Sequence, residues 1–147
     1  MLTTEKIRRI RQFNRDYTRV LGVMNKQIFG TTLSWPEGRI MIEIGLNHLT
    51  APMQVASRLG LDRSYTSRTI NRLVKRGLIE KLPSPTDSRS VQLRLTPTGR
   101  QVFEQINARS DDQLVDLIHD LSPAAQEELY ASFAVIDDLL FRREGEN

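Results

Sequence analysis

Two short helical segments joined by a glycine, with a strand-turn-strand pattern directly behind them, constrain the fold of this chain most strongly. Residues 52–59 and 63–76 have apolar side chains at helical spacing, and Gly60 between them favours a tight turn. A short apolar run over 78–82, a polar turn and strict alternation over 91–95 then indicate a β-hairpin. Helix, turn, helix and hairpin in this order predict a winged helix-turn-helix.

Two helical segments are predicted ahead of this unit. Residues 5–29 repeat apolar side chains at steps of three and four, which predicts one long amphipathic helix ended by Gly30. Residues 34–37, Ser-Trp-Pro-Glu, have the features of a helix start, because a serine can cap and the glutamate completes a capping box. That second helix is expected to end near His48.

Two more helices are predicted after the hairpin. A Thr-Pro pair at 96–97 and a Ser-Pro pair at 122–123 each begin a segment with apolar residues at helical spacing. The chain has 147 residues, which is the size of one domain. We therefore expect a mainly α fold with a small β-hairpin wing.

Composition limits the chemistry open to the chain. It has no cysteine, and its two histidines, His48 and His119, lack partners at ligand spacing, so we expect no disulfide, metal or cofactor. No apolar run approaches the ~20 residues that span a bilayer. The N-terminus also lacks the apolar core of a signal peptide. These features favour a cytoplasmic protein without a membrane partner.

Basic side chains are concentrated in the middle of the chain. Residues 58–100 carry 10 basic and 3 acidic side chains, whereas residues 101–147 carry 3 basic and 11 acidic ones. A compact basic block suits a surface that binds phosphates. The alternative is a positive face that is only solvated, and charge alone does not choose between the two.

The second helix of the central pair carries groups suited to the major groove of DNA. If Thr66, Ile70 and Leu73 pack inward, the rest of residues 63–76 displays cations, hydroxyl groups and one amide, and no carboxylate. Arginine can bind guanine through two hydrogen bonds, and hydroxyl groups bond to bases or phosphates. The candidate DNA-binding residues of this helix are Arg63, Ser64, Tyr65, Ser67, Arg68, Arg72 and Lys75.

The expected roles differ along this helix. Arg68 and its neighbours toward the first turn would approach base edges, as the start of a recognition helix does. Arg72 and Lys75 would mainly contact phosphates. The alternative for each is a solvated side chain, which we favour for Asn71 and Arg76.

The tip of the predicted hairpin carries the sequence Asp87-Ser88-Arg89. Arginine suits a narrow minor groove, where the electrostatic potential is most negative. A carboxylate two residues away can orient the guanidinium, so we expect Asp87 to support Arg89. The tripeptide is a weak signal alone and gains weight from its position behind a recognition-type helix.

Several short stretches together make the chain resemble the MarR family of transcription regulators. They are residues 61–64, Arg68, and residues 73–79, 87–91 and 95–100. The match is tight over 52–100, and the flanking helices are collinear. The resemblance implies a homodimer with interleaved terminal helices and two winged helices on a pseudo-palindromic operator in double-stranded DNA. It also implies that Arg89, supported by Asp87, enters the minor groove.

Two features set this chain apart within that resemblance. Residues 7–22 look most like MarR-type domains fused to an acetyltransferase, and we expect no such domain in 147 residues. Some family members sense oxidants through cysteine, and a chain without cysteine cannot do so.

Dimerisation is also expected from the apolar surface. The stripe of residues 5–29 and those of the two C-terminal helices exceed what a small winged-helix core can cover, so a second copy is expected to bury them. A two-fold dimer would space two recognition helices by about one turn of DNA, ~34 Å. We expect one MarR-type domain over 1–147, with the DNA-binding part at 34–96 and dimerisation helices at 5–29 and 97–143.

The resemblance further implies a ligand. MarR-like regulators often bind small aromatic acids or phenols between the dimerisation helices and the winged helix. The residues that would line such a site here are Tyr17, Trp35, Arg39 and His48. Each has a simpler interpretation, as a core or interface aromatic for Tyr17 and Trp35 and as a helix-end residue for His48.

An enzymatic function is not expected. The sequence has no Gly-rich phosphate loop, nucleophile motif or metal-ligand spacing, and adjacent carboxylates such as Asp111 and Asp112 diverge on a helix. We therefore expect a sequence-specific transcription regulator, by default a repressor. The alternative is an architectural or protein-interaction winged helix that does not read sequence.

Overall fold

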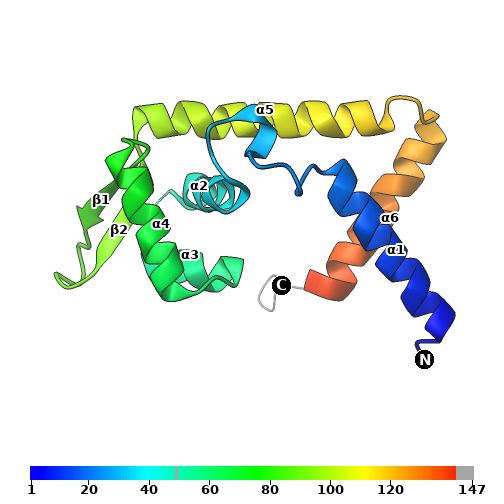
Figure 1. Cartoon of the computed structure of the whole chain (residues 1–147), viewed down its shortest axis with the longest axis horizontal. Coiled ribbons are helices and arrows are strands. Elements are labelled where there is room, and N and C mark those ends of the chain that lie inside the picture. Colours follow the sequence, from blue (N-terminus) through cyan, green and yellow to red (C-terminus); the bar gives the residue numbers. More distant parts are fainter. Residues whose placement is uncertain (49, 142–147) are drawn as a thin grey trace. The chain divides into compact units, whose positions relative to one another are not determined.

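The computed structural model describes residues 1–48 and 50–141 of the chain, so the end of the predicted segment 97–143 lies outside the described residues. Within them the chain forms a mainly α fold with one antiparallel hairpin, as predicted (Figure 1). The elements are α1 (Thr4–Val20), η1 (Ile28–Gly30), α2 (Trp35–Asn47), α3 (Pro52–Leu59), α4 (Arg63–Lys75), β1 (Ile79–Pro83), β2 (Val91–Leu95), α5 (Pro97–Ile118) and α6 (Pro123–Phe141).

The chain divides into two compact units. The first, Met1–Ser110, contains every element up to the first part of α5, and the second begins at Asp111. In the described residues no helix is both long enough and apolar enough to cross a membrane.

The N-terminal helix is shorter than the sequence predicts. The hydroxyl of Thr3 accepts a hydrogen bond from the backbone N–H of Lys6 at its start, and the helix ends at Val20. Gly22 then takes a left-handed conformation with φ of +73°. The prediction of a single long helix over 5–29 is therefore wrong. The apolar residues keep their helical spacing through a turn in which the backbone is no longer helical.

The predicted capping box at the start of α2 is confirmed. The backbone N–H of Ser34 donates to Oε2 of Glu37 at 2.9 Å, and Oγ of Ser34 accepts from the backbone N–H of Glu37 at 3.4 Å. The helix ends at Asn47, beside His48, as expected. Ile40, Met41 and Ile44 are fully buried, so one side of α2 lies in the core of the first unit.

The helix-turn-helix also forms where the sequence predicts it. Gly60 turns the chain in a left-handed conformation with φ of +62°, and Oδ1 of Asp62 accepts from the backbone N–H of Tyr65 at 2.8 Å. The three residues predicted to pack inward from α4 are all buried, and they are Thr66, Ile70 and Leu73. Their burial fixes which side of α4 faces away from the core.

The wing is tied to the start of the helix pair. β1 and β2 pair in register from Ile79 opposite Leu95 to Pro83 opposite Val91. The backbone N–H of Leu93 donates to the carbonyl of Thr50 at 2.8 Å, which adds a bridge between β2 and the residues before α3. A backbone hydrogen bond thus links the hairpin to the residues just before α3.

The first and last helices, α1 and α6, contribute no buried side chain to this core. The core consists of side chains from η1, α2, α3, α4 and the hairpin, together with Leu33, Leu78, and Phe103 and Ile106 of α5. Neither α1 nor α6 has a buried residue in the single chain. The large apolar side chains exposed on these helices are Ile7, Ile10, Phe13, Val20, Tyr130, Val135, Ile136, Leu139, Leu140 and Phe141.

Candidate nucleic-acid interface

The side of α4 that faces away from the core carries most of the predicted DNA-binding residues. Tyr65 is half-buried, and the remaining candidates are exposed. These exposed residues are Arg63, Ser64, Ser67, Arg68, Arg72 and Lys75. The helix itself contains no carboxylate, so its exposed face would not repel a phosphate backbone.

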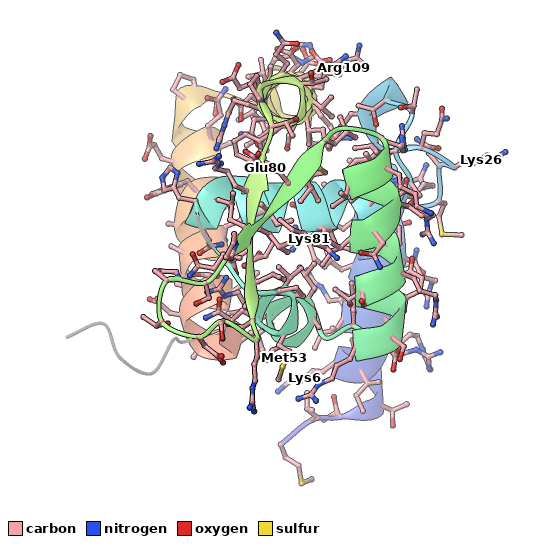
Figure 2. All side chains as sticks on the ribbon, turned by 90° about the vertical axis from the view of Figure 1, so that its left-hand side faces the viewer. Lys6, Lys26, Met53, Glu80, Lys81 and Arg109 are labelled. Atoms are coloured by element: carbon pink, nitrogen blue, oxygen red, sulfur yellow. The ribbon has the colours of Figure 1, made fainter. Side chains whose placement is uncertain are left out.

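A shallow hollow joins the first turns of α3 and α4. It has a volume of about 200 Å³ and is lined by Pro52, Met53, Ala56, Arg63 and Ser67. Met53 is exposed at the start of α3 and is labelled beneath that helix in Figure 2. Met53 was not predicted from the sequence, although an exposed apolar residue at the start of the helix that precedes the recognition helix suits contact with a thymine methyl group.

Arg72 is oriented differently from the other predicted contacts. Its Nη2 donates to Oγ1 of Thr69 at 3.1 Å, and its Nε lies 3.9 Å from Oε1 of Glu37 on α2. Arg76 approaches the same carboxylate, with Nη1 at 3.8 Å from Oε2. Both guanidinium groups are therefore engaged within the protein, and neither contact was predicted.

Asn71, an exposed residue of α4, contacts the wing. Nζ of Lys81, which is labelled on β1 in Figure 2, donates to Oδ1 of Asn71. Across the hairpin, Nε of Arg94 lies 2.7 Å from Oε1 of Glu80. The first contact links the stem of the wing to α4, and the second links its two strands.

Asp87 supports the wing tip through the backbone. Its Oδ1 accepts from the backbone N–H of Arg89 at 2.9 Å, and its carbonyl accepts from the backbone N–H of Ser90 at 3.1 Å. The predicted contact was to the guanidinium of Arg89, whereas the carboxylate instead shapes the turn, as aspartate often does. The side chain of Arg89 is exposed at the tip.

The four candidate ligand residues are not gathered at one place. Trp35 and His48 stand at opposite ends of α2, which puts them about 20 Å apart at the usual helical rise. Tyr17 stacks on Phe13 within α1, with ring centroids 5.3 Å apart. Arg39 is exposed on α2. A small ligand could therefore contact only some of the four.

Trp35 is the most distinctive of these candidates. Its indole Nε1 is buried and has no hydrogen-bond partner among the described residues, and its ring centroid lies 5.7 Å from that of Phe29. Buried donors are normally satisfied, so this N–H is unusual, and a ligand acceptor could bind it once neighbouring side chains move aside. No group of three histidine or carboxylate side chains in residues 1–48 and 50–141 is placed to bind a metal.

The helix pair, the basic face of α4 and the tethered hairpin define a winged helix-turn-helix protein. Residues 30–90 match the model of the MarR family. BilQ of Clostridioides difficile, an HTH-type transcriptional regulator, is 31% identical over 99 residues, which cover 67% of each chain. The multiple antibiotic resistance protein MarR of Salmonella typhimurium is 28% identical over 92 residues, covering 63% of this chain and 64% of that one. The chain thus spans about two thirds of these relatives.

Two solved structures show the same fold. Wild-type MarR of E. coli in its apo form has a TM-score of 0.71 at 23% identity, covering 95% of this chain and 98% of that one. FabT of Streptococcus pneumoniae in complex with DNA has a TM-score of 0.72 at 23% identity, covering 90% and 99%. The chain belongs to the MarR family of DNA-binding transcription regulators.

Proposed function

We propose that this protein is a repressor that binds a pseudo-palindromic operator in double-stranded DNA as a homodimer. The observation that carries the proposal is the carboxylate-free, exposed basic face of α4, followed by a hairpin that presents Arg89. Repression is the simplest outcome, because a dimer seated over a promoter blocks the polymerase without further contacts. The names of the relatives, which are regulators, support this class of function.

The proposed docking uses two grooves. The first turns of α4, with Ser64, Ser67 and Arg68, enter the major groove, while Lys75 contacts phosphate. Arg89 enters the flanking minor groove. The hollow lined by Met53 and Arg63 lies between the first turns of α3 and α4, so we include Met53 in the proposed interface.

The homodimer is proposed from the apolar side chains that the single chain leaves exposed on α1 and α6. A soluble protein seldom exposes so many large apolar side chains on two helices without a partner. A second copy would bury them and would supply the second recognition helix that a pseudo-palindromic operator requires.

An effector is part of the proposal. The unpartnered Nε1 of Trp35 suits an acceptor oxygen of a small aromatic acid or phenol. We expect such a compound to lower the affinity for the operator. Calorimetry with salicylate-type compounds checks this, and the absence of both heat and any change in DNA affinity would remove the effector from the proposal.

The experiment that tests the function is a binding titration with genomic DNA fragments. Footprinting upstream of the protein's own gene should identify the operator, and the operator fragment should bind ~10³-fold or more better than random DNA at the same salt concentration. Equal binding to all fragments would instead favour an architectural winged helix.

Replacing Arg89 with alanine should weaken operator binding by about 1–2 kcal/mol, because the exposed guanidinium is lost from the minor groove. The loss should be largest where the flanks of the operator are A·T-rich. Titration of the variant on operators with A·T-rich and G·C-rich flanks measures both effects. Lys26→Ala removes one positive charge at an exposed position outside the wing, and an equal loss in that control would contradict the minor-groove role.

A further inference from the structure

Both carboxylates of α2 contact arginines of the helix-turn-helix. Glu37 is only 14% exposed and lies 3.9 Å from Nε of Arg72 and 3.8 Å from Nη1 of Arg76, at the C-terminal end of α4. Glu43 is 15% exposed and lies 3.4 Å from Nη1 of Arg58 on α3. Each helix of the pair therefore has its own ionic contact with α2.

Glu37 joins more parts of the protein than Glu43 does. Its Oε2 also accepts the backbone N–H of Ser34 in the capping box, at 2.9 Å. Arg76 in turn donates to Oγ1 of Thr32 at 2.6 Å. Because the capping box fixes the glutamate side chain, Arg72 of α4 and Arg76 at its C-cap have a firmly held partner.

The segment that carries Glu37 is itself anchored to α5. Arg109 of α5, labelled in Figure 2, donates to the carbonyl of Phe29, and the ring of Phe29 packs against Trp35. Trp35 begins α2, two residues before Glu37. A continuous series of contacts thus runs from α5 through residues 28–37 to the recognition helix.

We propose that Glu37 is a positioning residue that sets the orientation of α4 and keeps Arg72 and Arg76 from indiscriminate phosphate contacts. The proposal rests on the proposed DNA-binding function. Base contacts need accurate geometry, whereas a flexible arginine attracts any phosphate nearby. Loss of the anchor should therefore reduce specific binding and increase non-specific binding at the same time.

The substitution Glu37→Gln tests this with the least disturbance. It removes the charge but keeps an amide oxygen that can accept the backbone N–H of Ser34, so the capping box survives. We expect the ratio of operator to random-DNA affinity to fall about tenfold, or ~1.4 kcal/mol. We also expect random DNA to bind more tightly, with a salt slope steeper by about 0.9 for each freed arginine that reaches a phosphate.

Two controls separate positioning from stability and from net charge. Glu43→Gln removes a carboxylate of similar burial from the same helix and frees Arg58 of α3. Glu104→Gln makes the same charge change on an exposed position of α5. Both should keep the specificity ratio within about threefold of wild type, a margin of ~0.7 kcal/mol. A tenfold fall in either control would overturn the proposal, because a loosened fold or a changed net charge would then suffice.

Amide hydrogen exchange on the DNA-free protein provides a readout that does not depend on function. Glu37→Gln should speed exchange in residues 70–75 and leave α3 unchanged, and Glu43→Gln should do the reverse. Unchanged exchange in α4, or a specificity ratio equal to that of wild type, would overturn the proposal. If wild-type protein prefers no DNA sequence, the repressor proposal fails, and hydrogen exchange alone decides whether Glu37 anchors α4.

Discussion

Arg68→Ala should weaken operator binding by about 1–3 kcal/mol and relax the preference for one base pair in each half-site. Arg68 is exposed on α4, on a helix without carboxylates, so its guanidinium is available for two hydrogen bonds to a guanine edge. The buried residues that hold α4, such as Ile70, are untouched, and alanine favours the helix. The lost affinity therefore reports on DNA contact and not on folding.

Titrations on the operator and on a set of single base-pair substitutions measure both effects of Arg68→Ala. Lys75→Ala is the matched control, since it removes a cation from the same helix. It should weaken binding to all sequences about equally and reduce the salt slope by about 1, with the base preference intact. If Arg68→Ala binds the operator as wild type does, or if the two variants behave alike, the proposed docking of α4 is wrong.

The second large effect is expected from a charge placed on the apolar face of α1. Ile10 is 51% exposed in the single chain, and α1 contributes no buried residue to the core. Ile10→Glu should therefore leave the winged helix folded but separate the dimer. Because two linked recognition helices bind far more tightly than one, operator affinity should fall by about 10² or more.

Light scattering after gel filtration would measure the mass of the Ile10→Glu variant, and anisotropy titrations would compare the full operator with a single half-site. Half-site affinity should stay near that of wild type. Gln12→Glu adds the same charge two residues along and so on the other side of the helix, where it should leave the dimer intact. A variant that remains dimeric, or a monomer with full operator affinity, would contradict the proposed assembly.

The local parts of the fold could be predicted because short-range chemistry specifies them. Gly60 supplies a left-handed turn, Asp62 caps α4, and the alternation in residues 91–95 separates a buried face from a solvent face. Each of these features depends on neighbours within four residues. The order of the elements then left few folds to consider.

The end of α1 could not be predicted in the same way. Periodicity reports which side of a segment is apolar and not where the backbone stops being helical. The apolar residues after Val20 keep their spacing through a turn in which Gly22 has a positive φ. Gly22 is visible in the sequence as a possible helix end, but the apolar spacing on both sides of it favours a continuous helix.

The contacts of Glu37 lay beyond sequence reasoning for a different reason. Its capping role is local and was predicted, whereas its arginine partners are separated from it by 35 and 39 positions and meet it only after α2 packs beside α4. The same limit applied to the role of Asp87. A carboxylate near an arginine can accept a hydrogen bond from its guanidinium or from its backbone N–H. In the turn at the wing tip, Asp87 accepts from the backbone N–H of Arg89.

The bridge between Thr50 and Leu93 has a consequence for the DNA that this protein would recognise. It fastens the base of the wing to the residues that lead into α3, so the hairpin that carries Arg89 is held against the helix pair that carries Arg68. Under the proposed docking, the distance along the DNA between the major-groove and minor-groove contacts should therefore be constant. One base pair inserted within a half-site should abolish binding. A change in the spacing between the two half-sites would instead have to be accommodated by a change in the dimer.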